Sequence, residues 1–419
     1  MRIAVVGTGI AGAAAAWLLS RRHEVDVFER EARPGGHTHT VAAARGDGTT
    51  VPVDTGFIVY NEATYPLLVR LFDELGVATQ ASDMSWSLRC ERCDLEYAGS
   101  ARGIVAQPSN LSSPAYLRML GDIARFNRLG SRLVEDPRTT TLTIGRFLEV
   151  AGFGHGFRHH YLLPMAAAIW SSGTGAIEGF PLATLLRFFA NHGLLGVTTH
   201  HAWRTVVGGT SSYLAPLTAP YRDRLHLGTP VTAVHRDRSG VDLLLGDGRR
   251  HRADAVVLAT HADEALALLA APSAREKELL SAWEYSVNDT WLHTDASLLP
   301  RRPAAWASWN YLLDDCTRPT EHVSLSYHMN RLQSLSEPRE YIVTLNPSTP
   351  PAAGSVLRRL TYTHPRYTRD SVQAQTELDE LNGRQRTFFV GAYQRYGFHE
   401  DGLWSAIRAA QRLGVRWPT

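Results

Sequence analysis

Near the N-terminus, three glycines have the spacing G-x-G-x-x-G: Gly7, Gly9 and Gly12. They directly follow the apolar segment 3–6, which has the character of a strand, and they lead into the Ala-rich segment 11–21, which has the character of a helix. A second strand-like segment, 24–28, ends at Glu29, 22 residues after the first glycine. This order of strand, glycine loop, helix, strand and acid predicts a βαβ unit that binds a dinucleotide.

Each of these four residues has a physical reason for its position. Gly7 permits a tight turn, Gly9 lets the backbone approach a pyrophosphate, and Gly12 allows the helix to pack closely on the strand. The N–H groups at the start of the helix are free to bind phosphate oxygens. Glu29 is expected to accept hydrogen bonds from the ribose hydroxyls. A glycine-rich turn in an unrelated α/β sheet is the alternative, and it would leave Glu29 unexplained.

Two more glycine-bearing turns follow, at 33–37 and 53–57. An enzyme that binds only a nicotinamide dinucleotide does not need them, whereas they could let the backbone pass a bulkier ring system. The residues in these turns that we expect to contact the cofactor are Arg33, Gly35, Gly36, His37, Gly56 and Phe57. His37 and His39 form an H-x-H pattern, but no carboxylate or thiol stands nearby in the sequence to complete a metal site.

The C-terminal part contains a second motif of strand, glycine turn and helix. Segment 387–390 reads as a short strand, Gly391 and the turn 397–402 follow it, and 403–413 is Ala-rich and helix-like. A strand, a glycine turn and a helix again present backbone N–H groups to an acceptor. The alternative is a terminal helix with a glycine at its start and no ligand.

These motifs together resemble the glutathione-reductase-like FAD fold, in particular the amine oxidase and phytoene desaturase superfamily. That superfamily has a Gly-Gly pair shortly after the ribose-binding acid, as at Gly35 and Gly36, but the next residue is usually Arg and here it is His37. This departure weakens any transfer of amine oxidase chemistry to the chain.

The resemblance implies FAD as the cofactor, with particular contacts. Val231 would lie beneath the adenine, in a strand-rich segment that returns to the nucleotide-binding domain. Gly402 and Leu403 would donate their N–H groups to flavin N1 and the C2 carbonyl, where negative charge collects when the flavin is reduced. We expect the FAD to be bound non-covalently, because no Cys or His stands where an attachment can be argued.

Several further stretches narrow the resemblance: 35–40, 54–61, 64–66, 306–311, 330–333, 344–347 and 397–402. They are similar to bacterial FAD-dependent oxidoreductases associated with cyclopropane-fatty-acid-synthase-like methyltransferases, and to the N-terminal flavin domain of plant cyclopropane synthases. The resemblance covers essentially the whole chain. It implies a lipid or other apolar small-molecule substrate and a lipid methyltransferase as a partner.

The expected fold class is α/β, with a glutathione-reductase-like Rossmann FAD domain and an interleaved α+β substrate domain. The FAD domain would collect residues 1–62, 201–262 and 380–419, and the substrate domain residues 63–200 and 263–379. Within the first insert, 65–75, 114–133 and 181–193 read as helices. Within the second, 323–327 and 341–345 read as strands.

Composition excludes some classes of function. The chain has 419 residues and a formal net charge of +2. Such a small positive charge does not produce an electrostatic field that would attract nucleic acid. Outside the nucleotide motif, the apolar runs are far shorter than the ~20 residues of a membrane span. We therefore expect a cytoplasmic protein with no nucleic-acid partner and at most peripheral contact with the inner face of the membrane.

Three cysteines, Cys90, Cys93 and Cys316, are too few for a disulfide framework and fit a reducing compartment. Cys90 and Cys93 form one C-x-x-C between two alternating segments, which favours a hairpin turn over a zinc or redox site. His159 and His160 are expected to be structural. No metal site is predicted.

The expected reaction follows from electron balance. The sequence has no second G-x-G-x-x-G after a strand, so a dedicated NADPH site is not expected. The flavin should take a hydride at N5 from the substrate and pass the electrons to oxygen, a quinone or a carrier, or return them in an isomerisation. Our preferred reaction is oxidation or desaturation of an unsaturated or methyl-branched acyl chain. The alternatives are a flavin amine oxidase and a flavin-bound, non-catalytic partner of a lipid methyltransferase.

Few residues are candidates for catalysis. His399 and Glu400 stand beside the expected flavin-facing turn and are the best, although solvated or capping roles are the alternative. The apolar runs 161–170 and 185–195 are expected to line an acyl-chain tunnel or to be core helices. Lys277 is the single lysine, and its surroundings predict a solvent-facing helix rather than a flavin contact.

Overall fold

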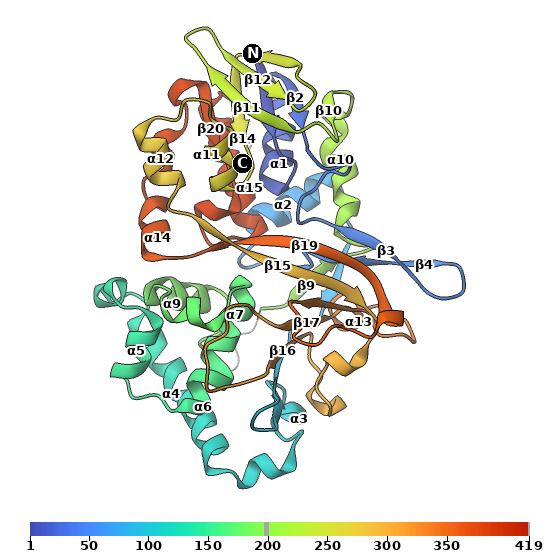
Figure 1. The fold of residues 1–419 in the computed structure, drawn as a ribbon, viewed down its shortest axis with the longest axis vertical. Coiled ribbons are helices and arrows are strands. Elements are labelled where there is room, and N and C mark those ends of the chain that lie inside the picture. Colours follow the sequence, from blue (N-terminus) through green and yellow to red (C-terminus); the bar gives the residue numbers. More distant parts are fainter. Residues whose placement is uncertain (197–200, 418–419) are drawn as a thin grey trace.

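The computed structural model describes residues 1–196 and 201–417. A parallel sheet with its helices forms one part of the molecule, and a large mixed sheet with a group of helices forms the other (Figure 1). The long strands β15 and β19 run between the two parts in this view (Figure 1). A cofactor bound to the parallel sheet therefore faces the mixed sheet.

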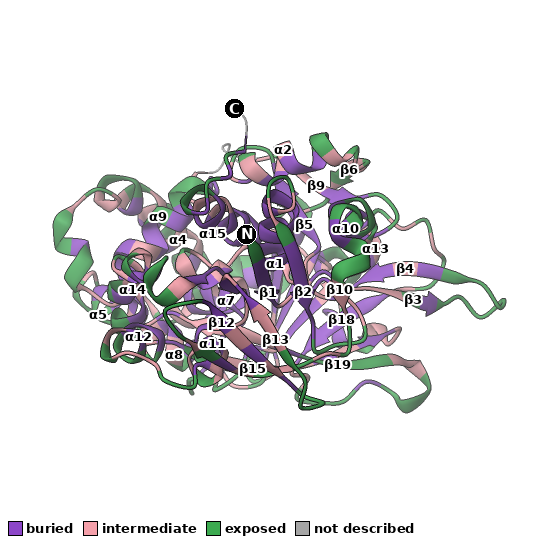
Figure 2. Ribbon diagram, turned by 90° about the horizontal axis from the view of Figure 1, so that it is seen from above, coloured by how far each residue is buried: buried purple, intermediate pink, exposed green. Residues whose placement is uncertain are grey.

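The parallel sheet is built from segments far apart in the sequence. Among the described residues it has five strands, in the order β10 (Leu225–His226), β2 (Glu24–Phe28), β1 (Arg2–Val6), β14 (Ala255–Leu258) and β20 (Thr387–Phe389). The apolar residues 3–6 of β1 are buried because helices cover both faces of such a sheet. Figure 2 shows β1, β2 and helix α1 (Ile10–Leu19) as buried elements. This is the predicted Rossmann arrangement.

An antiparallel meander precedes β14. It consists of β11 (Val231–Arg236), β12 (Val241–Leu245) and β13 (Arg250–Ala253). The structure thus confirms the strand-rich segment that the sequence analysis expected to return to the nucleotide-binding domain, where β14 pairs with β1.

The large mixed sheet joins both inserts of the predicted substrate domain. Within the described chain its order is β19 (Val356–Arg366), β15 (Glu284–His293), β18 (Ile342–Leu345), β17 (Leu325–His328), β16 (Trp309–Leu313), β7 (Trp86–Cys90) and β8 (Leu95–Ala98). All neighbours are antiparallel except β7 and β16, which are parallel, with Cys90 opposite Leu313. The first insert thus supplies two strands to a sheet that the second insert dominates.

Short sheets connect the two parts. One pairs β3 (Thr40–Ala44) with β4 (Thr50–Asp54), and the other contains β5 (Val59–Asn61), β9 (Trp203–Val206) and β6 (Thr79–Ser82). The tip of the β3–β4 hairpin projects from the molecule and is exposed (Figure 2).

The first insert is largely helical, as predicted. Its helices are α2 (Pro66–Leu75), α3 (Ala101–Ile104), α4 (Pro114–Leu133), α5 (Ile144–Val150), α6 (His155–Phe157), α7 (Leu163–Trp170), α8 (Thr174–Glu178) and α9 (Leu182–Asn191), with a π-helical turn at Arg158–Leu162. The later helices are α10 (Leu214–Thr218), α11 (Ala262–Leu268), α12 (Ala274–Leu280), α13 (Met329–Leu332), α14 (Arg369–Gln375) and α15 (His399–Arg412). In the described part of the chain, no helix is long and apolar enough to cross a membrane.

The terminal helix α15 begins earlier than the sequence predicted. It starts at His399 rather than at residue 403. The carboxylate of Asp401 accepts the N–H groups of Tyr396 and Phe398, which fixes the first helical turn. The glycine turn therefore ends before His399, and Gly402 lies inside the helix.

Candidate flavin and substrate site

A cavity of about 1780 Å³ extends from the β1–α1 loop to the large mixed sheet and the helices of the first insert. One end is lined by the glycine motifs that the sequence singled out. The other end is lined by side chains of β7, α4, α7 and α9. A cavity of this volume has room for a dinucleotide and a second molecule.

The β1–α1 loop has the geometry that its glycines predicted. Gly7 has a φ of +99°, and a Cβ on it would lie 2.8 Å from the carbonyl oxygen of Ala259. A Cβ on Gly12 would lie 2.0 Å from the carbonyl oxygen of Gly7, so only glycine lets α1 pack this closely. A Cβ on Gly9 would meet nothing within 4 Å, and Gly9 lines the cavity. The backbone of Gly9 is thus open to a ligand.

Glu29 directly follows β2; the residue lines the cavity and is 8% exposed. The carboxylate accepts the N–H groups of Thr8 and Glu31, each at 2.9 to 3.0 Å, so its position is fixed. The hydroxyl of Thr8 also contacts Glu29, and it accepts the N–H of Gly35 at 3.1 Å. Thr8, which the sequence analysis did not single out, therefore joins the first glycine loop to the second.

The turn at 33–37 packs directly on the first loop. A Cβ on Gly36 would lie 3.1 Å from the Cα of Gly9. The guanidinium of Arg33 donates to the carbonyl oxygen of Gly36 at 3.0 Å and holds the turn. Gly35 has a φ of +111°, which favours glycine.

The third glycine turn pairs with the second. The N–H of Phe57 donates to the carbonyl oxygen of His37 at 2.8 Å, and a Cβ on Gly56 would lie 2.1 Å from the same oxygen. All three residues line the cavity. Atom Nε2 of His37 is buried without a hydrogen-bond partner among the described residues, so a ligand in the cavity could satisfy it. Burial, with nearby histidines and Arg33, lowers the pKa of His37 and keeps it neutral.

Two more predicted contacts line the cavity. Val231 stands at the start of β11, on the nucleotide side, where the expectation placed the adenine. Gly391 follows β20, and its N–H donates to the hydroxyl of Ser405 at 2.9 Å. A Cβ on Gly391 would lie 2.4 Å from the ring of Tyr393. The glycine cradle, the fixed carboxylate and the open Gly9 backbone fit FAD.

His399 is the catalytic candidate that faces the cavity. Its ring stacks on Phe57 with a centroid distance of 3.7 Å, and its Nε2 lies 3.0 Å from the hydroxyl of Thr38. Burial lowers its pKa to about 3, so it is neutral at physiological pH. His399 therefore supports Phe57 at the wall of the flavin site.

Glu400 does not face the cavity. Its carboxylate accepts the N–H groups of Leu67 and Leu68, each at 3.0 Å, at the start of α2. The capping role, which the sequence analysis left open, is thus the correct one, and Glu400 is not a catalytic candidate. The cause is the early start of α15, which turns Glu400 toward α2.

Gly402 and Leu403 are also displaced from their predicted role. The N–H of Gly402 donates to the carbonyl oxygen of Phe398 at 3.1 Å, and neither residue lines the cavity. A Cβ on Gly402 would lie 2.8 Å from Cγ2 of Ile10, so this glycine allows α15 to pack on α1. The helix end that faces the cavity is instead formed by Gly397, Phe398 and His399.

The end of the cavity away from the glycine motifs is apolar and aromatic. Its lining includes Trp86, Tyr161, Met165, Ile169, Trp170 and Phe188. The runs 161–170 and 185–195 thus belong partly to the cavity wall and partly to the core, and an acyl chain as the occupant of the cavity stays a prediction. One face of each segment lines the cavity, while residues such as Leu162 and Leu185 are fully buried in the core.

Carboxylates are confined to the nucleotide end. Among the described residues that line the cavity, the acids are Glu29, Glu31 and Glu264, and Glu264 is paired with Arg30 next to Glu29. The cavity wall also offers unpaired donors. The hydroxyls of Tyr367 and Tyr393 and the indole N–H groups of Trp86 and Trp309 are buried without a hydrogen-bond partner among the described residues. Sequence reasoning missed these four, because nothing in their local spacing marks them.

Two remaining sequence expectations concern residues outside the cavity. Lys277 is exposed on α12, as predicted. Cys90 ends β7 and Cys93 lies in the hairpin turn that leads to β8, in agreement with the predicted hairpin. However, Cys316 and His160 lie beside them, so the expectation of no metal site overlooked four side chains that could together hold an ion.

The fold and the site together define an FAD-dependent oxidoreductase whose cavity continues from the nucleotide-binding loops to the large mixed sheet. Residues 10–305 match the family model described as flavin containing amine oxidoreductase, and the chain belongs to this family.

Solved structures share the fold over almost the whole chain. A cofactor-binding variant of putrescine oxidase has a TM-score of 0.71 at 16% identity, and cyclohexylamine oxidase from Brevibacterium oxydans has 0.70 at 16%, each covering 99% of both chains. A fatty acid isomerase from P. acnes that produces CLA has 0.67 at 18% identity, also with 99% coverage of both chains.

A curated relative matches a shorter segment. Carotenoid phi-ring synthase from Streptomyces griseus is 41% identical over 85 residues, which are 19% of this chain and 16% of that protein. The chain therefore matches less than a fifth of that relative's length.

Proposed function

We propose that this FAD-dependent oxidoreductase oxidises or desaturates the acyl chain of a lipid. The observation that carries the proposal is the apolar substrate end of the cavity, where no carboxylate stands among the described lining residues. An ammonium group would lose its hydration there without gaining an ion pair, whereas an alkyl chain gains about 0.8 kcal/mol for each buried CH₂. The resemblance to lipid-associated flavoproteins and the fatty acid isomerase and carotenoid enzyme among the matches support the same class.

The residues of the chain would bind and orient this substrate. FAD supplies a hydride acceptor when bound. The apolar walls exclude water, and the unpaired hydroxyls of Tyr367 and Tyr393 can donate to a polar group of the lipid. Desaturation also releases a proton. His192 lines the cavity and is neutral, but burial lowers its pKa to about 4 and its Nε2 lies 3.4 Å from the hydroxyl of Thr64, so it is a weak base and we assign the proton to no side chain.

Amine oxidation is the second candidate, because aromatic faces can bind a cation. Tyr285, Tyr367 and Tyr393 line the cavity, and oxidases of amines share the fold. A third candidate is a flavin-bound, non-catalytic partner of a lipid methyltransferase. For all three candidates we propose a lipid methyltransferase as the partner. We also propose that this protein is located in the cytoplasm, with at most peripheral contact with the membrane.

Anaerobic flavin reduction tests the three candidates. The FAD-loaded protein is mixed without oxygen with a membrane lipid extract and then with a panel of amines, and bleaching of the flavin is followed. Reduction by the lipid fraction is the expected result. Reduction only by a small polar amine would move the assignment to amine oxidation, and no reduction by either would favour the non-catalytic partner.

A variant sharpens this test. Met165→Glu places a carboxylate in the apolar end of the cavity, so lipid-dependent reduction should fall by at least about tenfold, equivalent to ~1.4 kcal/mol, while FAD stays bound. Val150→Glu is the matched control, because Val150 is 69% exposed at the end of α5. In an amine oxidase, Met165→Glu would not reduce turnover of a cationic substrate in this way.

A further inference from the structure

All three cysteines of the chain meet one histidine in the mixed-sheet part of the molecule. The Sγ atoms of Cys90, Cys93 and Cys316 and a ring nitrogen of His160 all lie within 4.8 Å of one another. The Sγ of Cys93 is 3.4 Å from Nε2 of His160. None of the three cysteines is in a disulfide.

The fold explains why residues so far apart in the sequence come together. Strands β7 and β16 are parallel neighbours, with Cys90 opposite Leu313, so the chain leaves both strands at the same edge of the sheet. The hairpin turn after β7 carries Cys93, and the turn after β16 carries Cys316. His160 reaches this edge from the π-helical turn Arg158–Leu162, a type of turn that is frequent at functional sites.

We propose that Cys90, Cys93, Cys316 and His160 bind a zinc ion. Three thiolates and one imidazole form a common structural zinc ligand set, with Zn–S near 2.3 Å and Zn–N near 2.0 Å. A tetrahedron with these bond lengths puts sulfur atoms about 3.8 Å apart and sulfur and nitrogen about 3.5 Å apart. Since the ligand atoms lie within 4.8 Å of one another, no distance between them needs to shorten by more than about 1.3 Å to reach this geometry.

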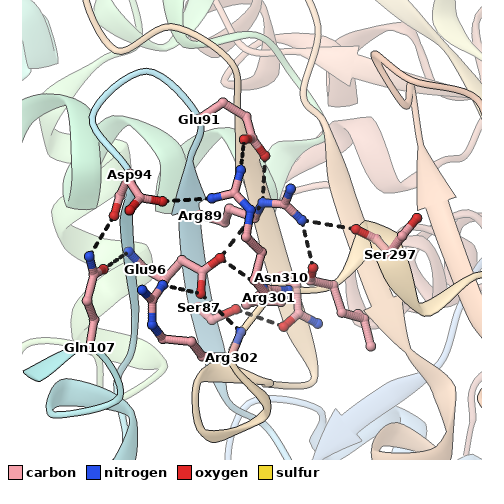
Figure 3. Close-up of polar contacts among 12 residues, drawn as sticks. Ser87, Arg89, Glu91, Asp94, Glu96, Gln107, Ser297, Arg301, Arg302 and Asn310 are labelled. Carbon is pink, nitrogen blue, oxygen red and sulfur yellow. Dashed lines mark hydrogen bonds and ion pairs between the residues drawn. The ribbon is translucent and has the colours of Figure 1, made fainter.

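The surroundings of the turn hold the thiols in place. The acids within the hairpin are paired with arginines: Glu91 contacts Arg89 and Arg301, and Asp94 accepts from Arg301 at 2.7 Å (Figure 3). On β8, the fully buried Glu96 accepts from Arg302 and from the backbone N–H of Arg301 (Figure 3). These carboxylates are occupied and do not compete with the thiols for a cation.

Hydrogen bonds to their backbone carbonyl groups hold Cys316 and His160 in position. Nε2 of His155 donates to the carbonyl oxygen of Cys316 at 3.1 Å, and the hydroxyl of Tyr97 donates to the carbonyl oxygen of His160 at 2.7 Å. Such contacts orient metal ligands in known sites. Cys90, Cys316 and His160 are buried, whereas Cys93 is exposed and offers a path for the ion to enter.

The role of the ion would be structural. Four protein ligands leave no position open for a substrate, which is typical of structural zinc. The ion would clamp the β7–β8 hairpin, the turn after β16 and the π-helical turn to one another. Tyr97 and Tyr161, which adjoin this clamp, line the substrate cavity. Binding would release up to three thiol protons, so it should be weaker in acid.

Metal analysis of the full-length protein, with FAD bound and any affinity tag removed, tests the proposal. About one zinc per chain is expected in the parent. Zinc should be lost from Cys93→Ser and Cys316→Ser, with the flavin content retained. His159→Asn is the matched control, because His159 is the neighbouring histidine in the same turn but is not in the cluster, and it should keep its zinc.

Cobalt provides a second measurement that needs no variant. Replacement of zinc by Co²⁺ in the parent should produce the intense visible absorption of a tetrahedral cobalt thiolate site. The absence of zinc, together with no cobalt spectrum and no rise in Tm when metal is added to the reduced protein, would overturn the proposal. A disulfide between Cys90 and Cys93 in protein alkylated before cell lysis would overturn it as well. These readouts do not depend on flavin reduction, so they are independent of the proposed substrate.

Discussion

Gly9 and Gly12 stand three residues apart, but their surroundings differ completely. A side chain on Gly9 would enter open space in the cavity, whereas one on Gly12 would strike the carbonyl oxygen of Gly7 at 2.0 Å. We therefore expect the ligand to require the first glycine and the fold to require the second. Substitution at the two positions should separate these requirements.

Gly9→Val should abolish FAD binding and leave the fold of the apoprotein intact, because φ at this residue is −56° and a Cβ here would meet nothing within 4 Å. Gly12→Ala should instead lower the Tm of the apoprotein. Flavin absorbance after gel filtration and thermal unfolding of the apoproteins check both. FAD retained by Gly9→Val would contradict the assignment of this loop to the pyrophosphate.

Lys277 should contribute little to turnover, because it is exposed on α12 and does not line the cavity. Lys277→Ala should leave turnover and flavin reoxidation within about threefold of the parent, a barrier change of less than ~1 kcal/mol. Stopped-flow reoxidation by oxygen measures this directly. A loss of about a hundredfold, ~2.7 kcal/mol, in a folded, FAD-loaded variant would show that this helix reaches the flavin.

At the scale of elements, helix ends account for the displaced site residues. The sequence placed the start of the terminal helix at residue 403, but the Asp401 carboxylate caps the turn before His399. This shift of one turn moves Gly402 into the interface with α1 and points Glu400 at α2. Such caps depend on where a carboxylate lies in space, so local patterns alone do not reveal them.

Glu400→Ala should destabilise the protein by about 0.5–2 kcal/mol, because the N–H groups of Leu67 and Leu68 at the start of α2 lose their acceptor. Flavin reduction by substrate should change less than about threefold. Urea unfolding and anaerobic reduction measure the two effects. Glu400→Gln, which keeps one acceptor oxygen, should lie between the parent and the alanine variant. Loss of reduction with unchanged stability would restore Glu400 as a catalytic residue.

At the scale of the whole molecule, burial controls the charge of several groups. Burial lowers the pKa of six histidines to about 4 or about 3: His39, His159, His192, His293, His364 and His399. Burial also raises the pKa of two carboxyl groups, Asp54 and Asp401, to about 7. The two sets of groups have opposite effects on the dependence of stability on pH.

The protein should lose stability as the pH falls from about 6.5 to about 4. In this window the unfolded chain binds a proton at each of the six histidines and the folded chain does not, so they destabilise the folded state in acid. The two buried carboxyl groups are protonated in the folded state and oppose this trend. The histidines outnumber them, so the slope should be positive, at about 1.4 kcal/mol per pH unit for each net proton. Urea unfolding across this range checks it, and unfolding free energies that rise toward pH 4 would contradict it.

The nucleotide site could be predicted from the sequence, because its chemistry resides in consecutive backbone. A glycine at a positive φ, a helix N-terminus and an acid at the end of the next strand are all set within about thirty residues. The parallel sheet, the meander and the helices of the first insert follow from apolar periodicity in the same way.

Only the tertiary structure decided which distant side chains meet. Cys90 and Cys316 are 226 residues apart and become neighbours because β7 pairs with β16, and Glu400 reaches α2 across more than 330 residues. The apolar end of the cavity likewise combines strands and helices from both inserts. These contacts arise from the packing of whole elements, which the periodicity of a single segment does not specify.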